Sequence, residues 1–122
     1  MAKGTYQKTN PRLSYLVALL KETARENDAK VWRVIAQNLE APSNNYAEVN
    51  IGKINRYAQD GETILVPGKV LGSGVLNQKV SVAALSFSES AIGKITGLDG
   101  SCMTIEELVA QNPKGTGVRI LR

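Results

Sequence analysis

The sequence predicts a single α/β domain of short strands and helices, with a helical N-terminal half. Two observations support this fold class. Apolar residues recur at helical spacing through the first half of the chain, whereas β-branched runs broken by glycine follow residue 61. A length of 122 residues, 43% of them hydrophobic, is enough for one modest core. We therefore expect a compact domain over residues 11–122 and an extended basic arm over residues 1–10.

Two helices are expected within the first forty residues. Asn10 and Pro11 suit the N-cap and first position of a helix. Asp28 is expected to cap the second helix, in which Trp32 belongs to the core and Arg33 points away from it. The apolar positions that define the two buried faces are Leu13, Leu16, Val17, Leu20 and Ala24, then Val31, Trp32, Ile35, Ala36 and Leu39.

A third helix is predicted to carry Val49, Ile51, Ile54 and Ala58 and to end at Asp60-Gly61, where glycine suits a left-handed conformation. Residues three and four apart are neighbours on a helix, so Lys53, Arg56 and Tyr57 would share another face. A solvated helix face is the simpler interpretation of these three residues taken alone. Contact with RNA is the alternative.

Short strands and tight turns are expected after Gly61. Thr63–Val66 and Lys69–Leu71 are predicted as separate strands around a turn at Pro67-Gly68. Val80–Phe87 is predicted as a longer strand with a bulge, or burial on both faces, near Ala84-Leu85.

Two helix starts are predicted in the second half. Ser88 can cap a short helix that contains Ala91 and Ile95. Thr104 and Glu107 have the spacing of a capping box, in which each side chain accepts from the backbone N–H of the other residue. This second helix should end by Asn112-Pro113, and Val118–Ile120 should form a closing strand.

The charge pattern suits a polyanionic partner. The chain has 15 Lys and Arg against 11 Asp and Glu, and Lys3, Lys8 and Arg12 all precede the first acidic residue, Glu22. No segment approaches the roughly 18–20 apolar residues of a membrane helix. With one cysteine, Cys102, and no histidine, we expect a protein of the reducing cytosol with no disulfide, metal or membrane partner.

Catalysis is not supported by any motif. Gly72-Ser73-Gly74 lacks the third glycine of a dinucleotide fingerprint, and a tight turn that permits close backbone approach explains it better. Ser73 and Cys102 have no histidine to activate them, so Cys102 is expected to be a small buried apolar residue. Glu106 and Glu107 point in different directions on a helix, which favours a structural use.

Several stretches, in their order and spacing, cover nearly the whole chain and together resemble one known family. They are Lys8–Leu13, Ala47–Ile54, Val66–Leu76, Val80–Ala84 with Phe87-Ser88, and Asn112–Gly115 with Val118–Ile120. This combination resembles the archaeal and eukaryotic large-subunit ribosomal proteins called eighteen-e, which are related to bacterial protein L-fifteen. The chain ends at Arg122 without the longer extension of eukaryotic members, which resembles the archaeal form.

The resemblance implies an L-fifteen/eighteen-e type fold, no catalysis and no cofactor. It implies a structural constituent of the large subunit in the cytoplasm, where the chain would bind large-subunit ribosomal RNA beside neighbouring ribosomal proteins, with no small-molecule substrate. The RNA contacts expected from this are basic, amide and aromatic side chains and the central glycine turn. They are Lys3, Lys8, Asn10, Arg12, Arg33, Asn45, Tyr46, Lys53, Arg56, Tyr57, Lys69, Gly72, Ser73 and Gly74.

The loop before Ala47 departs from the family pattern. Ser43–Tyr46 stands where members often carry Arg and His, so contacts there would be hydrogen bonds from Asn45 or stacking by Tyr46. A free, non-ribosomal RNA- or DNA-binding regulatory protein explains the charge equally well. A protein-only scaffold and an RNA-modifying enzyme are further alternatives.

Overall fold

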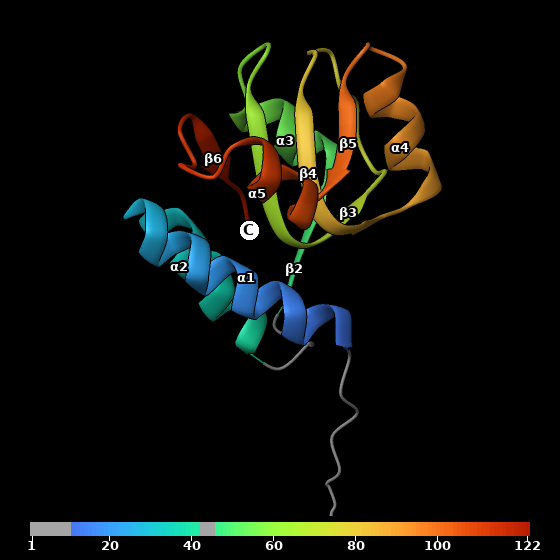
Figure 1. Cartoon of the computed structure of the whole chain (residues 1–122). Helices are drawn as coiled ribbons and strands as arrows, with labels where there is room; N and C mark the ends of the chain where they lie inside the picture. Colours follow the sequence, from blue (N-terminus) through green and yellow to red (C-terminus); the bar gives the residue numbers. More distant parts are fainter. Residues whose placement is uncertain (1–10, 42–45) are drawn as a thin grey trace, which may run out of the picture.

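A parallel sheet forms the middle layer of the computed structural model, which describes residues 11–41 and 46–122 (Figure 1). β3 pairs with β4 along one edge, and β4 pairs with β5. The other edge of β3 pairs with β6 near its start and with β2 near its end. The strands of the described residues are β2 (Ala47–Asn50), β3 (Thr63–Leu71), β4 (Ser81–Phe87), β5 (Ser101–Thr104) and β6 (Val118–Ile120).

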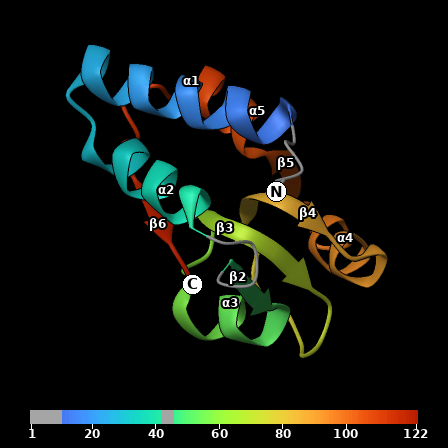
Figure 2. The same cartoon turned by 90° about the horizontal axis from the view of Figure 1, so that it is seen from below.

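Helices cover both faces of this sheet (Figure 2). α1 (Pro11–Asn27), α2 (Lys30–Glu40) and α5 (Ile105–Gln111) lie on one face, and α3 (Ile51–Tyr57) and α4 (Glu89–Thr96) lie on the other. Side chains alternate between the faces of a strand. Ile64 and Val66 therefore join the core beneath α3 and α4, while Leu65 between them joins the core beneath α1, α2 and α5. The predicted α/β fold class is confirmed.

The predictions that rest on local signals agree with the structure. Ser88 Oγ accepts from the N–H of Ala91 at 3.2 Å and caps α4. The capping box of α5 is complete, since Thr104 Oγ1 accepts from the Glu107 N–H at 3.0 Å and Glu107 Oε1 accepts from the Thr104 N–H at 2.8 Å. Trp32 is fully buried, as expected.

The prediction that Val49 belongs to the third helix is wrong. Ala47–Asn50 pairs in parallel with Gly68–Leu71, and α3 begins only at Ile51. Val49 is buried because it faces the core from a strand between two exposed residues, a pattern of period two. The helix also ends at Tyr57 rather than at Asp60-Gly61, although Gly61 does take the left-handed conformation, with φ of 84°.

The expected turn at Pro67-Gly68 is absent, because β3 runs through it. Val66 pairs with Ala84 and Lys69 with Ser86, so two residues of β3 stand opposite Leu85 alone. A bulge tolerates a proline, which cannot donate to the ladder. The predicted irregularity near Ala84-Leu85 is therefore present, and the extra residue lies on the neighbouring strand.

Asp28 is not the N-cap of α2. It adopts a positive φ of 51° at the end of α1, where the Ala29 N–H donates to the carbonyl of Ala24 at 3.0 Å. This is a left-handed helix end, which short polar residues adopt more readily than most. Ala29 holds the N-cap position and makes no side-chain cap. The other predicted cap, Asn10, lies outside the described residues.

Candidate nucleic-acid interface

A shallow hollow of about 540 Å³ brings together residues from α3 and from the loop that follows β3. We call it the α3 hollow. Among the residues that the structure describes, none that line this hollow is acidic, and two are basic. Five of the seven are among the predicted RNA contacts. The lining residues are Asn50, Gly52, Lys53, Arg56, Tyr57, Ser73 and Gly74.

One face of α3 is buried against the sheet, and the opposite face is exposed. Ile51 and Ile54 are fully buried against the sheet, which leaves Lys53, Arg56 and Tyr57 exposed. The Arg56 guanidinium lies 5.8 Å from the centre of the Tyr57 ring, within range of a cation–π contact. Lys53 Nζ donates to the backbone carbonyl of Arg122 and remains exposed. The hollow thus offers two cations and one aromatic ring, 48% exposed, to a partner.

The predicted glycines have different roles. Gly72 packs against α4, because a Cβ at this position would lie 1.8 Å from Ser90 Oγ. Gly74 faces α3, has φ of 100°, and leaves no room for a Cβ, which would lie 2.6 Å from Gly52 N. Close packing within the chain therefore requires both glycines, whatever the loop binds. Ser73, between them, is exposed.

A second depression runs from the start of α1 to β2. Two adjoining hollows of about 280 and 180 Å³ share Tyr46, Leu85 and Ser86, and they contain Lys69 and Arg12 respectively. The Tyr46 hydroxyl donates to the carbonyl of Leu39 at 2.7 Å, and burial raises its pKa. The strand register places Lys69 directly opposite Glu48, which also lines this depression. Its charge is therefore mixed, unlike that of the α3 hollow.

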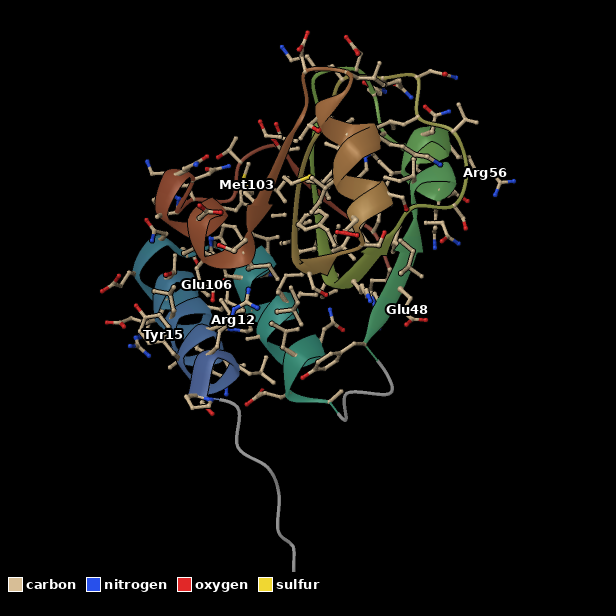
Figure 3. The ribbon with its side chains drawn as sticks, turned by 90° about the vertical axis from the view of Figure 1, so that its right-hand side faces the viewer. Arg12, Tyr15, Glu48, Arg56, Met103 and Glu106 are labelled. Carbon is tan, nitrogen blue, oxygen red and sulfur yellow. The ribbon has the colours of Figure 1, made fainter. Side chains whose placement is uncertain are left out.

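Arg12 joins α1 to α5 and β4. Its Nε and Nη2 donate to the two carboxylate oxygens of Glu106 at 2.9 and 3.2 Å, and its Nη1 donates to the carbonyl of Leu85 at 3.1 Å. Figure 3 shows Arg12 beside Glu106 and far from Arg56. Burial would raise the pKa of Glu106, but the hydrogen bond and charge of Arg12 outweigh it and lower this pKa. Arg12, which the sequence predicts as an RNA contact, therefore has a structural role in joining these elements.

This ion pair predicts a dependence of stability on pH. Folding lowers the pKa of Glu106, so its carboxylate stabilises the protein at pH values above the ordinary pKa of 4.5. This stabilisation is lost as the pH falls below that value. Arg12→Gln should reduce the free energy of unfolding at pH 7 by about 1 kcal/mol, since the pair is partly exposed. The difference from wild type should shrink between about pH 5 and pH 3. Urea unfolding at several pH values measures both effects.

The half-exposed pair of Lys21 and Glu40 supplies the control. Lys21→Gln should change the free energy of unfolding by less than about 0.5 kcal/mol. An Arg12→Gln deficit that stays constant down to pH 3 would contradict the assigned role of Glu106.

Of the remaining predicted contacts, Arg33 is the one that the structure describes. It is exposed on α2, as predicted, but lines neither the α3 hollow nor the second depression. Lys3, Lys8, Asn10 and Asn45 lie outside the described residues. Sequence reasoning missed Asn50 and Gly52, although Asn50 precedes Lys53 by three positions, a spacing that could have suggested a shared surface.

The described residues provide little for catalysis. Residues 11–41 and 46–122 contain no group of three His, Cys, Asp or Glu side chains able to hold a metal. Cys102 is half-buried rather than fully buried, and desolvation raises the pKa of its thiol, which disfavours the nucleophilic thiolate. No helix in this part of the chain is long and apolar enough to span a membrane.

Comparisons with known proteins agree on one family. A family model described as "Ribosomal protein 60S L18 and 50S L18e" matches residues 1–122. The large ribosomal subunit protein eL18 of Methanoregula boonei is 69% identical over 97% of this chain and 98% of its own length. The eL18 proteins of Methanosphaerula palustris and Halobacterium salinarum are 65% and 53% identical, over 98% and 94% of this chain and 98% of their own lengths. All three relatives are archaeal.

Proposed function

Since the chain belongs to the family of ribosomal proteins 60S L18 and 50S L18e, and is thus a structural constituent of the large subunit in the cytoplasmic ribosome, we propose that it binds large-subunit ribosomal RNA mainly through the α3 hollow. The family is structural rather than enzymatic. The observation that carries the proposal is that the hollow combines Lys53, Arg56 and Tyr57 with the exposed backbone of Ser73 and Gly74. Nothing observed favours a free regulator.

The chemistry of the hollow suits contact with the RNA backbone. Lys53 can neutralise a phosphate, and the Arg56 guanidinium can bind one through two hydrogen bonds. Tyr57 offers a ring face on which an unpaired base can stack. Asn50 adds hydrogen bonds without charge. Such contacts orient a protein on RNA and depend little on base sequence.

The depression between α1 and β2 is the second contact of the proposal. Tyr46 and Lys69 line it, and the Arg12 side chain, which binds Glu106 and the Leu85 carbonyl, is 44% exposed beside them. Because Glu48 repels phosphates there, this contact should contribute less than the α3 hollow. Arg33, Gly72 and the predicted contacts outside the described residues, Lys3, Lys8, Asn10 and Asn45, complete the proposed interface.

Ultraviolet crosslinking in living cells tests the proposal. The crosslinked RNA is sequenced, and the crosslinked peptides are mapped on the protein. We expect RNA crosslinks at a few sites of the large-subunit ribosomal RNA and peptide crosslinks within residues 50–57. RNA scattered over many transcripts, or peptides that never include α3, would contradict the proposed interface.

Salt dependence of binding gives a second test. Lys53→Met should weaken binding of the full chain to large-subunit ribosomal RNA and reduce the slope of log affinity against log salt by roughly 0.7–0.9, the counterion release of one phosphate contact. Filter binding between low and moderate salt measures the slope. Lys114→Met, in the exposed turn between α5 and β6, is the matched control and should leave the slope unchanged.

A further inference from the structure

Residues 72–75, which we call the glycine loop, are held from two sides. Lys94 Nζ, on α4, donates to the carbonyl of Gly72 at 2.6 Å and to that of Gly74 at 2.7 Å. On the other side the N–H of Gly52, in α3, donates to the carbonyl of Ser73 at 3.0 Å. Three successive carbonyl groups of an exposed loop are therefore bound within the chain.

These bonds determine where the N–H groups of the loop point. In a trans peptide the carbonyl and the following N–H point in opposite directions, and no cis peptide occurs in the described residues. The N–H groups of Ser73 and Val75 therefore point away from Lys94, and that of Gly74 points away from Gly52. Within residues 11–41 and 46–122, these three N–H groups donate to no protein atom.

The glycines keep this arrangement in place. Gly74 has φ of 100°, a conformation that side chains disfavour, and its close contact with Gly52 excludes a Cβ. Ser73, Gly74 and Val75 are all exposed residues, so the loop lies at the protein surface, open to a ligand. Backbone N–H groups at a turn that have no partner in the protein are a recurrent way to bind phosphate.

We propose that the glycine loop binds one phosphate of the RNA backbone through the N–H groups of Ser73 and Val75, and that Lys94 is the residue that positions them. The proposal rests on the function proposed above and deepens it. Lys53 and Arg56 line the same hollow as Ser73 and supply the positive charge. Lys94 acts differently from them, because its ammonium group donates to two carbonyls of the protein.

Salt dependence separates a positioning lysine from a contacting one. Lys94→Met should weaken binding to large-subunit ribosomal RNA about tenfold, the effect of one or two charge-assisted hydrogen bonds. It should change the salt slope much less than Lys53→Met does, since no phosphate loses its cation. A slope reduced as much as in Lys53→Met, or an affinity equal to that of Lys114→Met, would overturn the role of Lys94.

Removal of one N–H group tests the loop without altering charge. Val75→Pro lacks the donor, whereas Val75→Ala keeps it and loses a side chain that is 66% exposed. We expect weaker RNA binding, by about fivefold to tenfold, only in Val75→Pro. Equal affinities of the two variants would overturn the proposal.

Titration of the wild-type chain with inorganic phosphate, followed by amide NMR, tests the phosphate site in the absence of RNA. The resonances of Ser73 and Val75 should shift as phosphate is added, and the shifts should be much smaller in Lys94→Met. Unmoved resonances in the wild type would overturn the phosphate site. Wild-type chain that fails to bind ribosomal RNA yet shows these shifts would instead contradict the proposed function and keep the phosphate site.

Discussion

Trp32→Ala is expected to lower the free energy of unfolding by about 3–5 kcal/mol, a large part of the stability of a small domain. Trp32 is fully buried on α2, and its indole N–H donates to the carbonyl of Pro113 at 2.7 Å. The ring also lies beside Gly115, where a Cβ would be 3.5 Å from it. The indole therefore joins α2 to the turn that precedes β6. Urea denaturation measures the loss.

Two further variants make this prediction specific. Trp32→Phe keeps most of the apolar volume and loses the donor to the Pro113 carbonyl, so its cost should be intermediate. Tyr15→Ala removes an aromatic ring that is 65% exposed and should change stability by less than about 0.5 kcal/mol. Equal losses in Trp32→Ala and Tyr15→Ala would show that burial of the indole contributes nothing.

The features that could be predicted from sequence are those that depend on neighbours along the chain. The Ser88 cap and the Thr104–Glu107 box each involve residues three positions apart, so the sequence contains all the partners. The buried face of α2, including Trp32 and Ile35, follows from helical spacing in the same way.

Two of the wrong predictions concern partners that are distant in sequence. Val49 fits a helical pattern with Ile51 and Ile54, and only its pairing with Val70 makes it part of a strand. Pro67-Gly68 has the composition of a turn, yet β4 and β2 on either side keep it within β3 as a bulge. Tertiary pairing therefore outweighed local preference at both places.

The candidate site shows the same division. Spacing on one helix identified Lys53, Arg56 and Tyr57 as a group, but their meeting with Ser73 and Gly74 depends on how the end of β3 lies against α3. Lys94 could not be found from sequence. Its partners are backbone carbonyls 20 and 22 residues away, which leave no signal in the identity of a side chain.

Gly72→Val is expected to destabilise the protein by about 3 kcal/mol, at the upper end of the cost of overpacking, and to impair assembly of the large subunit. A Cβ at Gly72 would lie 1.8 Å from Ser90 Oγ, 2.7 Å from Ser90 Cβ and 3.0 Å from Ala91 N. The start of α4 and the glycine loop must therefore move apart, which also disturbs the contact between Lys94 and the Gly72 carbonyl. Urea denaturation and ribosome profiles on density gradients measure the two effects.

Matched variants separate this clash from a general intolerance of glycine replacement. A Cβ added at Gly93, which is also close to Lys94, would meet nothing within 4 Å outside the helix backbone, so Gly93→Val should change stability by less than about 0.5 kcal/mol. Ser90→Gly removes the two atoms that lie nearest to a Cβ at position 72. Combined with the milder variant Gly72→Ala, it should recover about 1 kcal/mol or more of the free energy of unfolding, a coupling that independent sites would not show. Lys114→Ala, on an exposed turn, should leave assembly intact. Ribosome profiles as defective for Lys114→Ala as for Gly72→Val would mean that charge, and not the fit of the glycine loop against α4, limits assembly.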